Sequence, residues 1–223
     1  MRTYRISFVY LCNKTTKIMK TVIFVWNRKS DVIPKEDTLR TALGANASTT
    51  ILWRKCQPDQ RHGTQAEAGD RFFIMKRNRV RQGIIMSGFI DKDPVQSQYE
   101  WQFVLSPDAF IDWTKEPFLD SKSFPDFKFG WLADLEEAVL LKEDAVILEL
   151  LWARHIFNTK GQICKPNSML NEALKLAKGE RCEYCGDVIN RKYDVFNKPG
   201  DDFMQNYLLL CETCASIQYL LEK

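Results

Sequence analysis

Four cysteines close to the C-terminal end carry the clearest chemistry in this sequence. They form two Cys-x-x-Cys pairs, Cys182 with Cys185 and Cys211 with Cys214, on either side of residues 186–210. Two intervening residues let one tight turn aim both thiolates of a pair at a single ion, and Zn²⁺ favours four such ligands in a tetrahedron. We therefore expect a structural Zn²⁺ site, with a hairpin in the long segment between the pairs.

Two other arrangements of these thiols remain open, namely two disulfides or four unrelated cysteines. Disulfides need an oxidising compartment, and the sequence shows no export signal, because the apolar run at residues 6–12 is short and no small-residue cleavage site follows it. We expect a cytoplasmic protein in which residues 1–18 are an N-terminal extension and a folded domain begins at Met19. The alternative is an ordinary first strand at residues 4–11. The remaining thiols are expected to be ordinary reduced cysteines: Cys12, Cys56 and Cys164.

Composition and charge limit the class of protein. With 223 residues, of which 45% are hydrophobic, the chain can form one full-sized domain and a small one. No apolar run approaches the ~18 residues of a membrane span. The net charge of +3 hides an asymmetry, since residues 54–81 hold eight basic and three acidic residues, whereas residues 107–149 hold eleven acidic residues and four lysines. Either one basic face binds a polyanion, or two solvated surfaces carry opposite charge.

The elements that must position these groups indicate an α+β fold. Short apolar runs rich in β-branched and aromatic residues predict strands at residues 21–26, 49–53, 71–76, 84–90 and 101–105. Five short strands with little helix between them favour a small curled sheet or pseudo-barrel. The sequence further predicts helices at residues 35–43, 134–156 and 168–179, with a polar linker at 157–167.

Several short strings, in their order and spacing, resemble an EVE domain, a member of the PUA-like superfamily. They are FVWN (24–27), LWR (52–54), AGDRFFIMKR (68–77), QGIIMSGFI (82–90) and KDP (92–94). The segment AVILELLW (145–152) is similar to the helix that follows this sheet in EVE proteins fused to HNH nucleases. The resemblance covers most of residues 20–155, and one departure is Arg28, where fused homologues often have proline. It implies a PUA-like curled sheet with flanking helices.

The C-terminal segment resembles the zinc-bound ββα scaffold of four-cysteine HNH endonucleases. CEYCG is followed by an expected hairpin and then by NYLLLCETC, and Asn206 stands in the place of their central asparagine. Fusions of this kind resemble modification-dependent restriction endonucleases, in which the EVE domain recognises a modified cytosine in DNA and the HNH domain cuts. The implied organisation is an extension (1–18), an EVE/PUA-like domain (19–156), a helical linker (157–180) and an HNH-like four-cysteine zinc module (181–223).

The same resemblance implies a base pocket on the sheet. A reader of a modified base takes that base out of the duplex and stacks it on aromatic rings. Trp26 and Trp53 each end an expected strand, and the Asn27 amide can read a base edge. The alternative is that both tryptophans are core residues. Further candidates for a wall are Trp101, Trp113 and Trp131. Phosphate contacts are expected from Arg54, Lys55, Arg77, Arg79 and Arg81.

The HNH-like module lacks the histidine that nuclease activity requires. HNH chemistry needs a histidine general base, yet residues 194–197 read DVFN at the corresponding strand end and Ala215 follows the last cysteine. The two histidines of the chain, His62 and His155, lie outside this module. We therefore expect that the module keeps its zinc, has lost its nuclease site and holds no catalytic residue.

Three functions remain open. The first is a DNA-binding reader of modified cytosine that flips the base, with a zinc module that adds contacts or recruits a partner such as a separate nuclease subunit. The second is an active modification-dependent HNH endonuclease in which Asp194 replaces the histidine. The third is an RNA-binding protein, because PUA-like folds also bind RNA. No membrane partner is expected.

Overall fold

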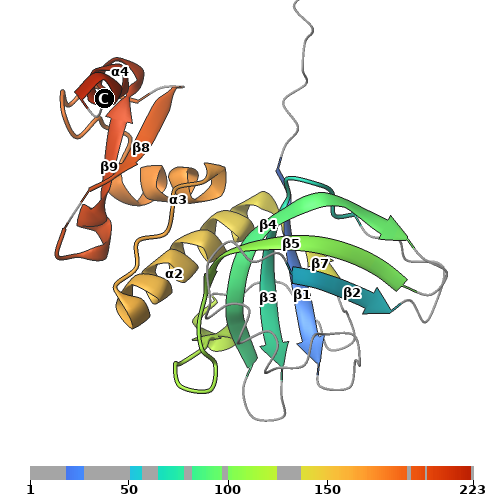
Figure 1. The fold of residues 1–223 in the computed structure, drawn as a ribbon. Helices are drawn as coiled ribbons and strands as arrows, with labels where there is room; N and C mark the ends of the chain where they lie inside the picture. Colours follow the sequence, from blue (N-terminus) through green and yellow to red (C-terminus); the bar gives the residue numbers. More distant parts are fainter. Residues whose placement is uncertain are drawn as a thin grey trace, which may run out of the picture.

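The computed structural model has an α+β fold, with a curled mixed sheet, helices beside it and a small C-terminal two-stranded sheet (Figure 1). It describes residues 19–27, 51–56, 65–77, 82–96, 100–124, 137–189, 192–198 and 200–221, and for residues 27, 51–56 and 100 it describes the backbone alone. The α+β class predicted from the sequence is confirmed.

The large sheet is mixed. Its strands are β1 (Thr21–Asn27), β2 (Ile51–Cys56), β3 (Arg71–Arg77), β4 (Gln82–Gln96), β5 (Glu100–Phe110), β6 (Leu119–Asp120) and β7 (Glu137–Val139). In the described part of the chain the order is β2-β5-β4-β3-β1-β7, and β6 pairs with β4. β1 and β3 run parallel, whereas the other paired strands are antiparallel.

The sheet buries its central strands on both faces. The four apolar side chains at residues 72–75 of β3 are all 0% exposed. A continuous apolar sequence, without alternating polar residues, is typical of a strand that is buried on both faces. Register shifts between β4 and β5 bend both strands. Gly88 lies at one of these shifts, where a Cβ would collide with the carbonyl oxygen of Ser106, so the close approach of the two strands requires glycine.

The predicted strands are confirmed where the structure describes them, but β4 and β5 are longer than expected. β4 continues through residues 91–96, which are largely exposed and polar, and residues 92–96 pair with β5. Their polar composition is typical of a loop, and they form a strand because they pair with β5.

The predicted helix at residues 134–156 is wrong in its bounds. Residues 137–139 form β7, because the edge of β1 that is not paired with β3 takes them as a partner. Helix α2 (Lys142–Lys160) follows and ends at Gly161, whose φ of 65° is left-handed and whose N–H bonds to the carbonyl of Phe157. The first four residues of the expected polar linker are therefore helical. The helix expected at residues 35–43 lies outside the described residues.

Helix α3 (Ser168–Lys178) agrees with the prediction to within one residue. Asn167 caps it, because its side-chain oxygen accepts from the N–H groups of Met169 and Leu170 at 3.0 Å each. Among the described residues, no helix is both long enough and apolar enough to span a bilayer.

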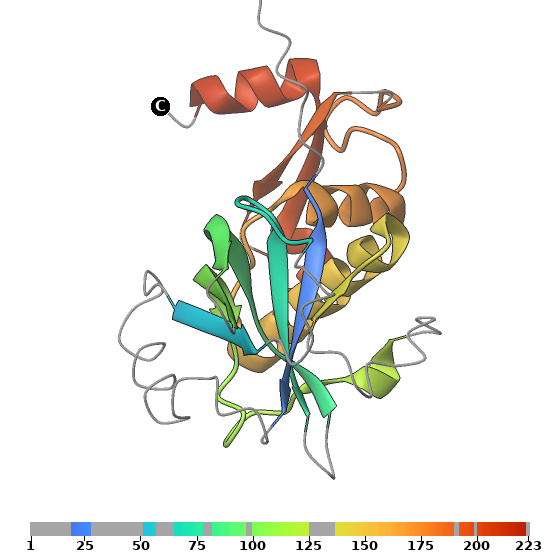
Figure 2. The ribbon, with the colours of Figure 1, turned by 90° about the vertical axis from the view of Figure 1, so that its right-hand side faces the viewer.

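The C-terminal segment forms a second small sheet beside these helices (Figures 1 and 2). Its elements are β8 (Tyr193–Asn197), the 3₁₀ turn η2 (Phe203–Asn206), β9 (Tyr207–Cys211) and α4 (Glu212–Leu221); a further 3₁₀ turn, η1 (Ser121–Ser123), follows β6. A buried cluster joins this segment to α2 and α3, and it consists of Ala153, Leu170, Leu174, Phe203 and Tyr207. The small sheet is therefore packed against the helices.

Candidate functional site

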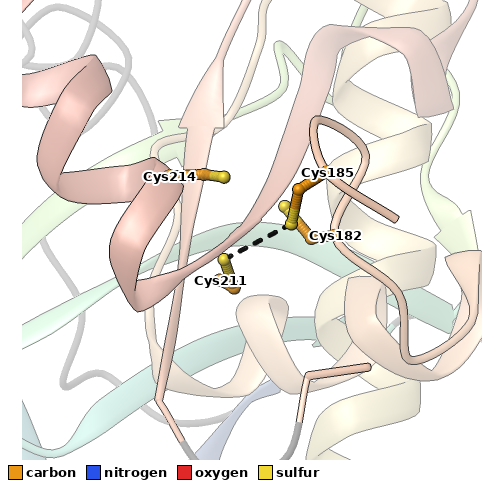
Figure 3. Close-up of side chains that lie close together, drawn as sticks. All are labelled: Cys182, Cys185, Cys211 and Cys214. Carbon is orange, nitrogen blue, oxygen red and sulfur yellow. Dashed lines mark hydrogen bonds between the residues drawn. The ribbon is translucent and has the colours of Figure 1, made fainter. Parts of the chain in front are cut away.

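The four predicted ligand cysteines lie together in space (Figure 3). All four sulfur atoms are within 4.8 Å of one another, and the sulfurs of Cys185 and Cys211 are 3.8 Å apart. A tetrahedral ion with metal–sulfur bonds of about 2.3 Å has sulfur–sulfur edges of about 3.8 Å. The thiols are thus arranged so that one metal ion can bind all four.

A tight hairpin positions the first pair. The N–H of Cys182 bonds to the carbonyl of Asp187 at 2.9 Å, and the N–H of Gly186 bonds back to the carbonyl of Cys182 at 2.9 Å. Gly186 has a φ of 80°, a conformation that favours glycine. This turn brings the thiol of Cys185 back beside that of Cys182.

The second pair spans the junction of a strand and a helix. Cys211 is the last residue of β9, and Cys214 lies in the first turn of α4. The pair therefore depends on the antiparallel pairing of β9 with β8, which places Cys211 opposite Tyr193.

The backbone around Cys182 favours its thiolate, whereas burial and the neighbouring thiols raise the pKa of Cys214. Burial alone would raise the pKa of Cys182, but hydrogen bonds from the backbone N–H groups of Cys185, Cys211 and Tyr184 outweigh it and lower the pKa to about 6. Metal ligation requires the deprotonated sulfur. Cys182 and Cys214 are buried, Cys211 is half-buried and Cys185 is exposed, so the cluster is most open to solvent at Cys185.

The residues at the two expected histidine positions are apolar and packed. Phe196 is 9% exposed, and its ring centroid lies 4.8 Å from that of Tyr219 on α4. Ala215 is 1% exposed. His155 stacks on Trp152 of α2 and lies 2.9 Å from the Pro117 carbonyl through Nε2. Among the described residues, the only group of three or more His, Cys, Asp or Glu side chains placed to share an ion is the four cysteines. His62 lies outside the described residues.

Asn206 closes the hairpin between β8 and β9. It is 2% exposed, its side-chain amide donates to the carbonyl of Asp202 at 2.8 Å, and its own carbonyl accepts from the N–H of Lys198 at 2.9 Å. All of these bonds are to backbone or from it, so they fix the turn that precedes β9. Asp194 is half-buried in β8 and pairs with Leu210.

No protein-family model, curated protein or solved structure matches this chain. The roles of its residues are therefore argued from their positions and contacts. Among the first candidates for the base pocket and for phosphate contacts, those that the structure describes lie on strands β1, β2 and β3 of the large sheet: Trp26, Asn27, Trp53, Arg54, Lys55 and Arg77.

Trp26, Trp113 and Lys76 form a cluster that we call the aromatic box, in which the lysine ammonium contacts both indole rings. The Trp26 ring meets that of Trp113 edge-on, with centroids 5.3 Å apart at 90°. The ammonium of Lys76 lies 4.0 Å from the Trp26 centroid and 4.7 Å from that of Trp113, within cation–π range. All three residues are 8% exposed. Sequence reasoning missed Lys76, because only the parallel pairing of β1 with β3 places it beside Trp26.

The structure describes few of the remaining predicted contacts. Arg77 is half-buried at the end of β3, paired with Gln82 of β4 and with Asn27 of β1. The side chains of Asn27, Trp53, Arg54 and Lys55, and all of Arg79, Arg81 and Trp131, lie outside the description. Trp101 is half-buried on β5. The phosphate contacts and the role of Trp53 therefore stay predictions.

A buried ion-pair network joins the two segments of opposite charge. The guanidinium of Arg71 bonds to both carboxylate oxygens of Glu149, at 2.5 and 3.3 Å, and to Asp108 at 2.5 Å. Ser87 donates to Asp108 at 2.6 Å and accepts from the indole N–H of Trp152 at 2.7 Å. The charge asymmetry of the sequence is therefore partly internal, and it fastens α2 to β3, β4 and β5.

Burial alone would lower the pKa of Arg71, but the carboxylates of Glu149 and Asp108 outweigh it and raise that pKa above its ordinary value. The guanidinium thus stays charged inside the protein. Arg71 is 2% exposed, so it is unable to contact a phosphate and acts within the core.

Proposed function

We propose that this protein binds nucleic acid through a PUA-like, EVE-type sheet, reads a modified cytosine in DNA by base flipping, and carries a structural Zn²⁺ in an HNH-type module without a nuclease site. The closed set of four thiols carries the metal part of this proposal, and the binding of DNA rests on the resemblance to EVE domains. A catalytic zinc keeps one position open for water or substrate, whereas a structural zinc is held by four protein ligands.

Zinc is the metal that best suits the donor set. Soft thiolate ligands in a tetrahedron favour Zn²⁺ or an iron–sulfur centre over hard cations such as Mg²⁺. The 3.8 Å separation of the Cys185 and Cys211 sulfurs suits a single ion of this size. The ion would fold the module and leave no coordination site for a scissile phosphate.

The loss of nuclease chemistry is supported by the packing at the two expected histidine positions. Phe196 and Ala215 are buried apolar residues, and neither accepts a proton. Asp194 is the one carboxylate on β8, and its side chain lacks the imidazole with which histidine exchanges protons near neutral pH.

The reading site is supported by the box of Trp26, Trp113 and Lys76. A planar base can stack on an indole ring, but Trp26 and Trp113 are each 8% exposed and belong to the buried core of the sheet, so a base reaches either ring only when neighbouring side chains move. The ammonium of Lys76 now covers the Trp26 face, so a flipped base would take its place as the lysine side chain moves aside. Arg77, the residue after Lys76, places a positive charge at the same strand end.

A binding experiment tests the reader. We expect duplex DNA with one modified cytosine to bind more tightly than plain DNA or RNA of the same sequence, at fixed salt because the phosphate contribution is common to all three. Trp26→Leu should lower the preference for modified over plain DNA roughly tenfold, the loss of one stacked base. The ratio is the quantity measured, since partial unfolding would reduce both affinities alike.

The phosphate contribution has its own control. Arg77→Gln should weaken binding to modified and plain DNA equally, whereas the exposed Lys165→Gln on the loop before α3 should change neither affinity. Equal affinity of the wild-type protein for modified and plain DNA would end the reader proposal, and tighter binding to RNA would favour the RNA-binding alternative.

A cleavage assay tests the loss of the nuclease. Incubation of modified and plain DNA with Mg²⁺ or Mn²⁺ should leave both substrates intact. If the protein cuts DNA, and if Asn206→Ala or Asp194→Asn abolishes the cut, the module is an active endonuclease and the proposal of a lost site is wrong.

A further inference from the structure

The two cysteine pairs carry a glutamate at the same position, yet the two glutamates have different surroundings. Glu183 follows Cys182 and Glu212 follows Cys211. The carboxylate of Glu212 bonds to Lys192 at 3.0 Å, in a pair whose side chains are 63% and 74% exposed. Such an exposed pair contributes little.

Glu183, in contrast, is joined to strand β9 twice. Its backbone N–H donates to the carbonyl of Leu209 at 2.9 Å, and its carboxylate accepts from the N–H of Leu209 at 2.6 Å. Glu183 thus bonds to the same residue of β9 through both its backbone and its side chain. Because Leu209 lies two residues before Cys211, this contact sets the position of the first cysteine pair relative to the second.

Lys178 of α3 holds this contact from outside the cysteine module. Its ammonium lies 2.9 and 3.0 Å from the two carboxylate oxygens of Glu183 and 2.6 Å from the carbonyl of Tyr207. Its side chain is 11% exposed. One ammonium therefore bonds both the first cysteine hairpin and the first residue of β9, and we call Lys178, Glu183 and Leu209 the knuckle clamp.

The knuckle clamp is continuous with the buried packing of the module on the helices. Tyr207, whose carbonyl Lys178 holds, is 1% exposed and packs with Leu174 of α3. Its hydroxyl donates to the carbonyl of Cys164 at 3.2 Å. One turn before Lys178, the ammonium of Lys175 lies 5.3 Å from the ring centroid of Tyr193 on β8. α3 thus contacts both strands of the small sheet.

We infer that Lys178 is a positioning residue for the metal centre, and that metal binding is coupled through the knuckle clamp to the docking of α3 on the small sheet. The inference rests on the proposed metal centre. The clamp brings the two cysteine pairs to the spacing that one ion requires, so less of the binding free energy is spent on ordering them. By linkage, a bound metal stabilises the docked α3 by the same factor that docking strengthens metal binding.

Metal affinity of clamp variants tests the inference. Lys178→Met should weaken Zn²⁺ binding about tenfold, the lower end for residues that orient metal ligands from outside, in competition with a chelator of known affinity. Lys178→Arg, which keeps the charge, should restore most of the affinity. Lys192→Met removes the matching pair beside the second cysteine pair and should leave the affinity unchanged.

A second variant and a second measurement show whether a loss of metal affinity comes from the clamp or from unfolding of the protein. Glu183→Gln keeps an oxygen to accept from Leu209 but loses the ion pair with Lys178, and it should weaken metal binding in the same direction. Hydrogen exchange should show that Zn²⁺ removal from the wild-type protein lowers the protection of α3, and that this effect of metal is smaller in Lys178→Met.

The outcomes distinguish a failure of the knuckle clamp from a failure of the proposed metal centre. Unchanged affinity in both Lys178→Met and Glu183→Gln, or an equal loss in Lys192→Met, would overturn the role of the clamp while leaving the metal centre intact. A wild-type protein that binds neither Zn²⁺ nor Co²⁺, the latter followed by its thiolate absorption, would overturn the metal centre itself.

Discussion

Cys211→Ser is expected to unfold residues 181–221 while the large sheet stays folded. The small sheet has a core of only a few buried residues, and two of these, Cys182 and Cys214, are candidate ligands. Structural Zn²⁺ supplies on the order of 10 kcal/mol in small modules at neutral pH. Such modules bury too little apolar surface to fold without this contribution. The large sheet has its own core of buried strands and needs no metal.

Far-UV circular dichroism and limited proteolysis measure this outcome. A chelator should reproduce the effect of Cys211→Ser in the wild-type protein, with new cleavage sites in residues 181–221 and none in the large sheet. Cys164→Ser is the matched control, because Cys164 is a free thiol outside the cluster and its known bond uses its backbone carbonyl. An unchanged digestion pattern after chelation would show that the module folds without metal.

Arg71→Met is expected to destabilise the large sheet by about 3–5 kcal/mol, the cost of removing one partner from a buried ion pair. Glu149 is 1% exposed, so its carboxylate would lose the guanidinium without gaining water. Asp108 would lose the same partner and keep the hydroxyl of Ser87, and because its side chain is 32% exposed, water would compensate part of this loss. Because Glu149 lies on α2, the contact of this helix with the sheet should loosen as well.

Equilibrium unfolding in urea measures the loss of free energy. Lys142→Met is the control, since its pair with Glu172 is exposed and such pairs contribute about 0–1 kcal/mol. The double variant Arg71→Met/Glu149→Met should recover part of the stability, because it leaves no unpaired charge on α2. A loss for Arg71→Met no larger than that for Lys142→Met would mean that the network is not the buried pair described above.

Local signals explain which elements could be predicted from the sequence. The strand β3 and the helix α3 follow from an apolar run and from a capped amphipathic segment, and both depend on neighbours within a few residues. The helix predicted at residues 134–156 failed because residues 137–139 pair with β1. That partner lies far away in the chain, so no local pattern reports it.

Contacts on the sheet show the same limit. Lys76 lies on the ring of Trp26 because β1 and β3 are parallel neighbours in a fixed register. Arg71 reaches Glu149, which is 78 residues further along the chain, because α2 packs beside β3. The sequence predicted a basic and an acidic segment but not that each contributes a partner to one buried network.

The spacing of the sequence identified the group that can hold a metal ion: four cysteines in two close pairs, with no histidine in residues 181–223. Tertiary contacts bring the four sulfurs within 4.8 Å of one another, pack Phe196 against Tyr219 of α4, and join α3 to the first cysteine pair through Lys178. The reason is physical. Spacing within a turn is set by local backbone geometry, whereas the meeting of two turns depends on strand pairing and packing between residues far apart in the chain.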